Sequence, residues 1–372
     1  MVKSNAALLF ESPGRYEVCE VDLDPPKDHE VLVRFAASGL CHSDVHFVLG
    51  EHSGPLPMCG GHEGAGIVED VGPGVTGLRP GDHVVASFIP GCGRCRYCAA
   101  GRSNLCTLGA KLQLGPQLDG TYRMHHAGRD ISQFLLISTF SAWSVVPEQS
   151  LVKIRADVPL ETVCLLGCGV GTGFGSAVNA ADVRPGDVVI VMGVGGVGIN
   201  AVQGAALAGA AVVAAVDPVP FKLDAAAKLG ATHTFAHIDA AAEFARTATD
   251  GQGADSAIVT VAGPTGDEVA QAFNAVGKGG TVVVTGMASE HTAPGIPVSL
   301  LMLAGYQKRI QGCLFGMCNP ASDILRQIDL YCAGHLKLDE LITRRYQLGD
   351  INQAVTDLLE GRNIRGVIVH DH

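Results

Sequence analysis

Hydrophobic and polar positions follow two different patterns along the chain. Near the start, short apolar or alternating runs are separated by Pro, Gly and Asp, which predicts strands at Ala6–Phe10, Tyr16–Val21 and Glu30–Ala36. Two later runs, Ala65–Gly72 and His83–Ala86, have the same character. A series of short strands of this kind is typical of a small barrel.

The middle of the chain alternates between strand-like and helix-like runs. A strand at Asp187–Met192 is followed by a glycine-rich turn, a helix at Ile199–Leu207 and a strand at Ala211–Val216. The alternation continues with a helix at Phe221–Leu229 and strands at Thr232–Phe235, Ala257–Val261, Thr281–Thr285 and Ile310–Phe315. We expect about six parallel strands with right-handed crossovers, the doubly wound sheet of a Rossmann domain.

The remaining segments return to a mixed pattern. Phe134–Phe140 predicts a further strand, Ala321–Ala333 and Ile351–Glu360 predict helices, and Val367–His370 predicts a short strand. Because 372 residues exceed what one hydrophobic core usually serves, we expect two domains. The fold class is therefore α/β, and the C-terminal segments are expected to rejoin the β-rich domain.

Charge and composition exclude some classes of function. The 26 basic and 37 acidic residues give a net charge of −11 without a Lys/Arg cluster, which argues against nucleic-acid and anionic membrane partners. Val188–Val216 has no charged residue, but its six glycines and its strand–turn–helix–strand pattern indicate a buried α/β segment. The N-terminus has no secretory signal pattern, so a cytoplasmic location is expected.

Four of the twelve cysteines, Cys92, Cys95, Cys98 and Cys106, fall within fifteen residues. Without a secretory signal, such clustering favours a metal site over disulfides. Four thiolates in one short lobe, about residues 91–107, fit a closed structural zinc site. The alternatives are an iron–sulfur cluster, whose usual spacings differ, and ordinary buried cysteines.

A second metal site is predicted from residues that are far apart in the sequence. A catalytic zinc takes three protein ligands and leaves one position open, and Cys41 and His62 supply a thiolate and an imidazole. Gly167–Gly175 is read as an unusual turn that enters a helix near Ser176, and Cys168 lies within it. Its glycine-rich setting favours Cys168 as the third ligand over a buried structural cysteine.

The glycine-rich turn after Met192 carries a dinucleotide fingerprint. Gly193–Gly198 matches G-x-G-x-x-G between a strand and a helix, and Asp217 ends the next strand. The residues expected at the pyrophosphate are Gly193, Gly195, Gly196, Val197 and Gly198. Asp217 would accept hydrogen bonds from ribose hydroxyls and repel a 2′-phosphate, which favours NAD over NADP.

Together these motifs resemble the zinc-dependent medium-chain alcohol dehydrogenases over essentially the whole chain. The residues that carry the resemblance are Gly60–Gly66, the four-cysteine lobe, Gly193–Gly198 and Asp217. The resemblance implies oxidation of alcohols to aldehydes, and the reverse, by hydride transfer to NAD. It also implies two zinc ions per chain and a homo-oligomer, with a dimer favoured.

The resemblance further implies how the domains are formed. A GroES-like catalytic domain would comprise residues 1–169 and 314–372, and a Rossmann NAD-binding domain would comprise residues 170–313.

Roles for the residues near the catalytic metal also come from the resemblance. Ser43 matches the hydroxyl that hydrogen-bonds the substrate oxygen, and His46 matches the distal histidine of a proton relay. Asp44 matches the carboxylate that orients the metal-binding histidine, a partner that chemistry also leads one to expect. Glu63 is either an acid near the metal or an ion-pair partner in the core.

The remaining matches concern the cofactor and the substrate. The cofactor contacts implied are His42, Thr172, Asp217, Lys222, Thr285, Met287 and Arg365, where Arg365 would contact the pyrophosphate. His42 stands where many relatives have an arginine against the pyrophosphate, so that contact loses charge. Phe88, Phe134 and Leu135 match the lining of the alcohol pocket, which suggests an apolar alcohol.

Within the family, the chain looks closest to the actinobacterial nicotinoprotein branch, which is NDMA-dependent and associated with mycofactocin. Those enzymes keep NAD bound and pass electrons to an external redox carrier. The main alternative is a formaldehyde dehydrogenase that depends on mycothiol or glutathione. Ala110 replaces the arginine that binds glutathione in that branch, which counts against glutathione. A zinc/NAD protein without activity and a metal-free quinone reductase are disfavoured by the intact ligand set.

Overall fold

The structure, a computed structural model, describes residues 2–371 and divides into two compact units. The first unit contains the chain up to Cys168, Asn319–Ala333 and the chain from Leu338 onward. The second unit contains Gly169–Cys318 and Gly334–Lys337. The sequence-based division places its boundaries within a few residues of these, and it misses the short segment that groups with the second unit.

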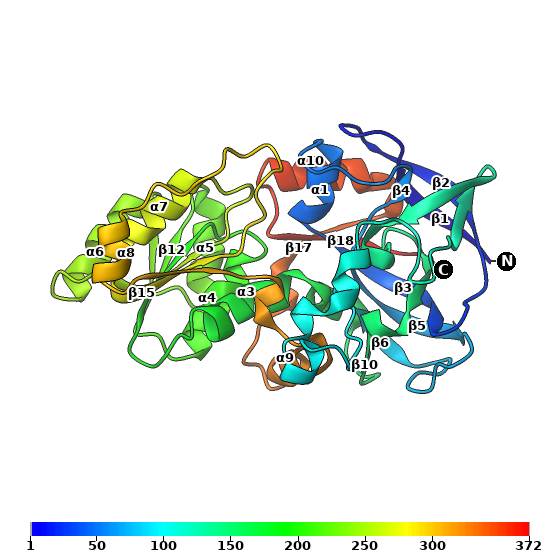
Figure 1. The fold of residues 1–372 in the computed structure, drawn as a ribbon, viewed down its shortest axis with the longest axis horizontal. Coiled ribbons are helices and arrows are strands. Elements are labelled where there is room, and N and C mark those ends of the chain that lie inside the picture. The colour runs from blue at the N-terminus through cyan, green and yellow to red at the C-terminus, as the bar shows by residue number, and fades with distance from the viewer. Residues whose placement is uncertain (1, 372) are drawn as a thin grey trace. The chain divides into compact units, whose positions relative to one another are not determined.

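The first unit contains a closed β-barrel and a larger mixed sheet (Figure 1). In order around the barrel, the strands are β1 (Val2–Leu9), β2 (Tyr16–Leu23), β7 (Met124–His126), β8 (Arg129–Gln133) and β4 (Met58–Cys59). In order across the sheet, the strands are β10 (Leu151–Ile154), β6 (His83–Ala86), β5 (Glu63–Val71), β3 (Glu30–Leu40), β18 (Arg365–Val369) and β17 (Ile342–Tyr346), and β9 (Trp143–Pro147) also pairs with β3. A small barrel is present as predicted, but the runs predicted at Glu30–Ala36, Ala65–Gly72 and His83–Ala86 form β3, β5 and β6 of the mixed sheet instead.

Strand β3 organises the functional part of this unit. It pairs with β5, β9 and β18, and its apolar side chains, including the fully buried Phe35, face the core on both sides. Its end at Leu40 delivers Cys41, and His62 lies just before β5. Antiparallel pairing with β3 brings Arg365, at the start of β18, into the same region, so the C-terminal segment returns to the first unit as predicted.

Four α-helices complete the first unit: α1 (His42–Val48), α2 (Leu160–Val163), α9 (Pro320–Cys332) and α10 (Ile351–Leu359). Cys41 is the N-cap of α1, and the Asp44 carboxylate accepts from the Cys41 amide, which closes a capping box. The predicted strand over Phe134–Phe140 is wrong, because that segment begins with a tight 3₁₀ turn at Phe134–Leu136.

The second unit is a six-stranded parallel sheet with helices, as predicted. In order across the sheet, the strands are β13 (His233–Phe235), β12 (Val212–Val216), β11 (Val188–Met192), β14 (Ala254–Val259), β15 (Val276–Val284) and β16 (Arg309–Gly312). The helices are α3 (Gly169–Gly175), α4 (Gly198–Leu207), α5 (Pro220–Lys228), α6 (Ile238–Ala248), α7 (Gly266–Ala275) and α8 (Leu300–Gly305). The strand order reverses beside β11, and ligands of such sheets bind at the carboxyl ends of the strands at that point.

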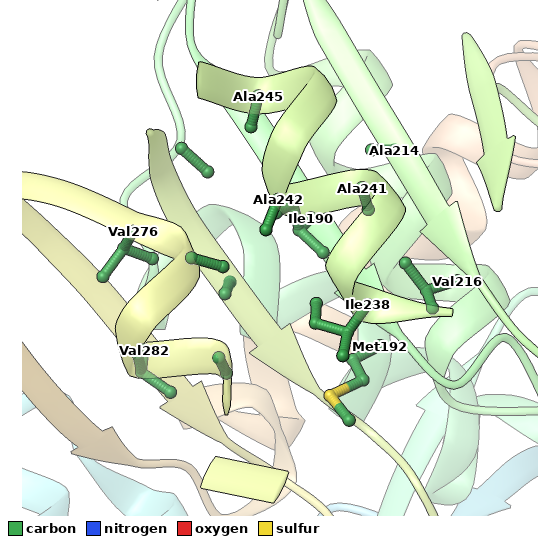
Figure 2. Close-up of a cluster of buried hydrophobic side chains, with 14 of the residues drawn as sticks. Ile190, Met192, Ala214, Val216, Ile238, Ala241, Ala242, Ala245, Val276 and Val282 are labelled. Atoms are coloured by element: carbon green, nitrogen blue, oxygen red, sulfur yellow. The ribbon is translucent and has the colours of Figure 1, made fainter. Parts of the chain in front are cut away.

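The core on one face of this sheet is shown in Figure 2. Ile190 and Val216 on the strands pack with Ala241, Ala242 and Ala245 on α6. Full burial of one Val or Ile side chain stabilises the fold by roughly 1.5–3 kcal/mol. The small alanine side chains let the helix lie close to the sheet, so the strand that leads into the fingerprint loop is held firmly.

The segment predicted as a glycine-rich turn is helical instead. Helix α3 contains four glycines although each one lowers helix stability by about 1 kcal/mol relative to alanine. Close packing explains them, because a Cβ added at Gly173 would lie 2.0 Å from the Val197 carbonyl oxygen. A Cβ at Gly175 would lie 2.1 Å from the Gly316 carbonyl oxygen. Tertiary contacts therefore override local propensity here.

The long apolar run Val188–Val216 forms β11, α4 and β12, as its pattern indicates. Within residues 2–371, no single helix is long and apolar enough to cross a membrane. One bent pair of helical segments, Leu160–Gly167 with Gly169–Ala180, passes the test of length and composition when the two are taken together.

Candidate metal and cofactor sites

Four buried side chains of the first unit converge on one point. The ligand atoms of Cys41, His62, Glu63 and Cys168 all lie within 4.8 Å of one another. Cys41 comes from the end of β3, His62 and Glu63 from the start of β5, and Cys168 from the last position of the unit's first segment. The structure therefore brings together the three residues predicted as ligands of the catalytic metal.

Asp44 determines how the imidazole of His62 is presented. Its Oδ1 accepts from His62 Nδ1 at 2.9 Å and from the Gly61 amide at 3.1 Å, while Oδ2 accepts from the Cys41 amide at 3.0 Å. Because a carboxylate can only accept, Nδ1 carries a proton, and Nε2 is the ring nitrogen that remains for a metal. Nε2 is buried and has no hydrogen-bond partner among the described residues, which is the state a metal ligand requires.

The donor set fits a catalytic zinc ion. Two sulfurs and one imidazole nitrogen are ligands zinc prefers, and three protein ligands leave a fourth position for substrate. A hydrogen bond with Cys168 lowers the pKa of Cys41 well below its usual range, and the His62 ring acts in the same direction. The same hydrogen bond raises the pKa of Cys168. The pair thus shares a proton that a cation would displace.

Glu63 and Arg365 form a buried ion pair behind this cluster. An Arg365 guanidinium nitrogen donates to a Glu63 carboxylate oxygen and also to the Leu40 carbonyl oxygen at 3.1 Å. Burial raises the pKa of Glu63 to about 7, although the Arg365 charge opposes this. Arg365 is 2% exposed and lies next to the metal ligands, so its predicted contact with the cofactor pyrophosphate stays a prediction.

The residues predicted for proton transfer lie on α1. The Ser43 hydroxyl is 3.8 Å from the Cys41 sulfur, so it adjoins the metal cluster. His46 is buried on the same helix, and its Nδ1 lies 2.5 Å from Oε2 of Glu51. Sequence reasoning missed Glu51, whose position just past the helix end was the available signal. His42, predicted at the cofactor, is the partly exposed first residue of α1.

Aromatic side chains form an apolar wall around His62. The Phe88 and Phe134 rings meet the imidazole edge-on, with centroids 5.7 and 5.5 Å away, and Phe134 also packs on Phe47 at 5.0 Å. Beside Phe134 lies a small, partly open hollow with room for little more than a water molecule. Its lining is mainly apolar: Phe47, Pro55, Met58, Leu112, Gly115 and Phe134, with Gln113 and Gln133. The predicted pocket residue Phe134 thus contacts both His62 and this hollow.

The turn that presents Phe134 has a strained backbone. Leu135, Leu136 and Ser138 have positive φ values of 51°, 69° and 45°, which cost energy for residues other than glycine. The Ser138 hydroxyl holds the turn by accepting from the Phe134 amide at 2.8 Å and donating to the Cys59 carbonyl at 2.6 Å. Leu135, the other predicted pocket residue, is buried at this turn.

The four cysteines of the lobe also form a compact set. The sulfurs of Cys92, Cys95, Cys98 and Cys106 lie within 4.8 Å of one another. Backbone amides point at them: the Cys92 amide donates to Cys106, and the Cys95 amide to Cys92, each at 3.4 Å. A hydrogen bond from the Cys98 amide is the main reason that the pKa of Cys95 is lowered to about 5. Burial raises the pKa of Cys98 to about 12 and also raises the pKa of Cys106, so a bound cation would be needed to hold all four as thiolates. Four sulfurs this close together fit a closed zinc site.

The second unit contains the predicted dinucleotide site. Gly193 follows β11 with φ +87°, and a Cβ added at Gly195 would meet nothing within 4 Å, which leaves room beside the loop. The loop runs into the N-terminus of α4, where free amides can bind phosphate. The loop residues predicted there, Gly193, Gly195, Gly196, Val197 and Gly198, all lie on this turn or at the helix start.

Asp217 ends β12 and faces the fingerprint loop. Its carboxylate accepts from the Val194 amide at 3.0 Å and the Val219 amide at 2.9 Å, and Lys222 lies 4.0 Å away. The carboxylate therefore holds the loop and keeps lone pairs for ribose hydroxyls.

Three other residues predicted at the cofactor belong to the same unit. Ser176 connects Thr172 and Thr285: its hydroxyl donates to the Thr172 carbonyl at 2.6 Å and lies 2.9 Å from the Thr285 hydroxyl. Met287 follows β15 and is exposed.

Comparison with known families agrees with this geometry. The family model named alcohol dehydrogenase GroES-like domain matches residues 27–156, and the one named zinc-binding dehydrogenase matches residues 196–330. The NDMA-dependent alcohol dehydrogenase of Amycolatopsis methanolica is 50% identical over 99% of both proteins. The putative alcohol dehydrogenase D of Mycobacterium tuberculosis is 51% identical over 99% of this chain and 100% of that protein.

Two solved structures match the whole chain. An alcohol dehydrogenase zinc-binding domain protein from Burkholderia ambifaria has a TM-score of 0.92 with 34% identity, at full coverage of both chains. The benzyl alcohol dehydrogenase of Acinetobacter calcoaceticus has a TM-score of 0.92 with 30% identity, also at full coverage. The chain is therefore an oxidoreductase that belongs to the zinc-binding medium-chain alcohol dehydrogenase family, and its relatives support the predicted actinobacterial branch.

Proposed function

We propose that this protein oxidises small apolar alcohols to aldehydes, and catalyses the reverse reaction, with zinc at the Cys41, His62 and Cys168 cluster and NAD as hydride acceptor. The observation that carries the proposal is the buried Nε2 of His62, which Asp44 orients toward two cysteine sulfurs. Bound zinc would supply Lewis-acid activation of the alcohol oxygen, and NAD would supply the hydride acceptor. A second zinc would be held by the four-cysteine lobe.

The protein's own residues prepare the proton transfer. Ser43, next to Cys41, is proposed to accept the hydrogen bond of the substrate hydroxyl and to take its proton. His46, buried on the same helix, is proposed to receive that proton and release it to water, a task suited to an imidazole near neutral pH. Thr172, Thr285, Met287, His42 and Arg365 are proposed to help bind and orient the cofactor.

NAD is proposed over NADP because of Asp217. Its carboxylate ends β12 beside the fingerprint loop, where the adenosine ribose of a dinucleotide binds in such folds. A negative charge there accepts from ribose hydroxyls and repels a 2′-phosphate. The segment that follows, Pro218–Lys222, contains no arginine that would offset this repulsion.

The substrate class is proposed from the wall around His62. Phe88, Phe134 and Leu135 are buried apolar side chains, and the rings of Phe88 and Phe134 meet the His62 ring edge-on. Such a lining favours aromatic or medium-length aliphatic alcohols, because each buried CH₂ group contributes about 0.8 kcal/mol. The match to a benzyl alcohol dehydrogenase supports the same class.

We further propose that NAD stays bound during turnover and is recycled by an external electron carrier. The support is the full-length 50% identity to an enzyme named for its dependence on NDMA. The test is a spectrum of freshly purified protein. Absorbance of bound reduced nicotinamide that is bleached by a nitroso dye, and not by added NAD, supports the proposal. Turnover of cofactor-free protein with exchangeable NAD contradicts it.

The principal activity is tested with a panel of alcohols and the nitroso dye. Oxidation of benzyl or medium-chain alcohols that disappears on zinc removal supports the function. The competing formaldehyde reading is tested in the same assay: formaldehyde turnover that requires mycothiol or glutathione would replace the alcohol proposal.

We propose a homodimer through the free edge of the second unit's sheet. Strand β16 is the last strand on that side, and the neighbouring α8 leaves Leu300 and Leu301 76% and 81% exposed. If β16 pairs with the β16 of a second copy, its edge backbone groups gain hydrogen-bond partners and these leucine side chains are covered.

A reducing compartment such as the cytoplasm is proposed because both cysteine clusters bind zinc only as reduced thiolates.

A further inference from the structure

A carboxylate that the family comparison does not assign lies against the buried histidine of α1. The helix ends at Val48, and Gly50, with φ +74°, lets the chain turn back toward it. The Glu51 amide then donates to the His46 carbonyl at 2.8 Å. This turn places the Glu51 side chain beside the His46 imidazole, five residues earlier in the chain.

The contact between the two side chains is short and spans the boundary between interior and solvent. Nδ1 of His46 lies 2.5 Å from Oε2 of Glu51. The His46 side chain is 5% exposed, whereas that of Glu51 is 38% exposed. The His52 ring packs edge-on against His46 at 5.0 Å and limits the rotation of the imidazole. A buried proton carrier is thus joined to water through one carboxylate.

We propose that Glu51 is a positioning residue of the proton path, forming a histidine–carboxylate dyad with His46. The inference rests on the proposed alcohol oxidation. Because the carboxylate accepts from Nδ1–H, Nε2 is the nitrogen with the lone pair, and the incoming substrate proton binds there. The negative charge of Glu51 then stabilises the imidazolium that forms, as a carboxylate does for a catalytic histidine. Loss of one proton from the imidazolium to water restores the neutral ring, and no other bond changes.

The test compares Glu51→Gln with the wild-type holoenzyme. Glutamine keeps the size and an acceptor oxygen but loses the charge. We expect kcat for alcohol oxidation to fall roughly 10–100-fold, within the range of general acid–base effects, with KM changed less than about twofold. Imidazole buffer at increasing concentration should restore kcat, and Glu51→Asp should retain more activity than Glu51→Gln. Zinc content and melting temperature should stay at wild-type values.

Glu148→Gln is the matched control. Glu148 forms the same kind of contact with an exposed histidine of the same unit, His29, at 2.6 Å. The control should leave kcat and its buffer dependence unchanged. If kcat of Glu51→Gln lies within twofold of wild type, or falls without buffer rescue while zinc content drops, Glu51 is not a positioning residue of the proton path.

An NMR measurement, which does not require catalytic activity, tests this inference separately from the proposed function. In ¹⁵N-histidine NMR spectra of the wild-type protein, His46 should carry its proton on Nδ1. Glu51→Gln should change the chemical shift of that Nδ1–H, because its acceptor loses the negative charge. Glu148→Gln should leave it in place. An unchanged His46 signal in Glu51→Gln overturns the dyad even if the protein oxidises alcohols. A wild-type protein without alcohol oxidation refutes the proposed function, whatever the spectrum shows.

Discussion

Nδ1 of His62 donates to Oδ1 of Asp44 across 2.9 Å, and this bond decides which imidazole nitrogen remains for a metal. The same carboxylate accepts the amides of Cys41 and Gly61. One side chain therefore fixes the backbone that carries one ligand and the ring orientation of another. Asp44 therefore holds the Cys41 backbone and the His62 ring in place without a bound ion.

Asp44→Asn should weaken zinc binding at the catalytic cluster by roughly 10–100-fold, because the amide lacks the charge that makes His62 a stronger ligand. Competition with a metal chelator measures the affinity, and alcohol oxidation should fall in parallel. Asp70→Asn is the control and should change neither quantity, because Asp70 is an exposed acid on β5 that accepts from the neighbouring Val71 amide. Wild-type zinc affinity in Asp44→Asn would show that the hydrogen bond is dispensable.

Cys95→Ser should remove one of two zinc ions and leave the catalytic one. Within the described residues the lobe forms short 3₁₀ turns, so the proposed zinc would supply much of its order. The melting temperature should drop by about 2–4 °C for each kcal/mol lost. Calorimetry and metal analysis measure both effects. Cys332→Ser, at an exposed cysteine outside both clusters, should keep two zinc ions; equal metal content in the two variants would argue against a zinc site in the lobe.

Asp217→Asn should weaken NAD binding about tenfold, equivalent to 1.4 kcal/mol, and narrow the gap between NAD and NADP, because the charge that repels a 2′-phosphate is gone. Asparagine can still accept from the Val194 amide, so the loop should stay in place. Fluorescence titration of cofactor-free protein gives both affinities. Asp224→Asn, at an exposed acid on α5, is the control and should keep the wild-type ratio of NAD to NADP affinity. An unchanged ratio in Asp217→Asn would show that other residues determine the choice of cofactor.

Ser138→Ala should destabilise the protein by about 1–3 kcal/mol, because it leaves the buried Phe134 amide and Cys59 carbonyl without their partner. The relaxed turn should also reduce discrimination between bulky and short alcohols. Chemical denaturation and kcat/KM ratios report the two effects. Ser150→Ala is the control, because the buried Ser150 hydroxyl has no hydrogen-bond partner among the described residues, and its loss should cost little.

Sequence reasoning selected Cys41, His62 and Cys168, which the structure brings together, and the Gly193–Gly198 loop, because the chemistry of such sites depends on residue type and spacing. It could not find the pairing of Glu63 with Arg365, which are 302 positions apart and meet only through the pairing of β18 with β3. The Phe134–Phe140 run reads like a strand because an apolar run has no helix or strand period of its own. The two hydrogen bonds of Ser138 hold it as a turn, and the partner of one of them, the Cys59 carbonyl, is 79 positions away in sequence.

The central claim is tested most directly by counting zinc in the wild-type protein and in His62→Ala while measuring alcohol oxidation. The account predicts two zinc ions per wild-type chain, one in His62→Ala, and loss of alcohol oxidation in the variant while the lobe keeps its ion. Full activity of a His62→Ala protein depleted of catalytic zinc, or a wild-type count near one, would contradict it.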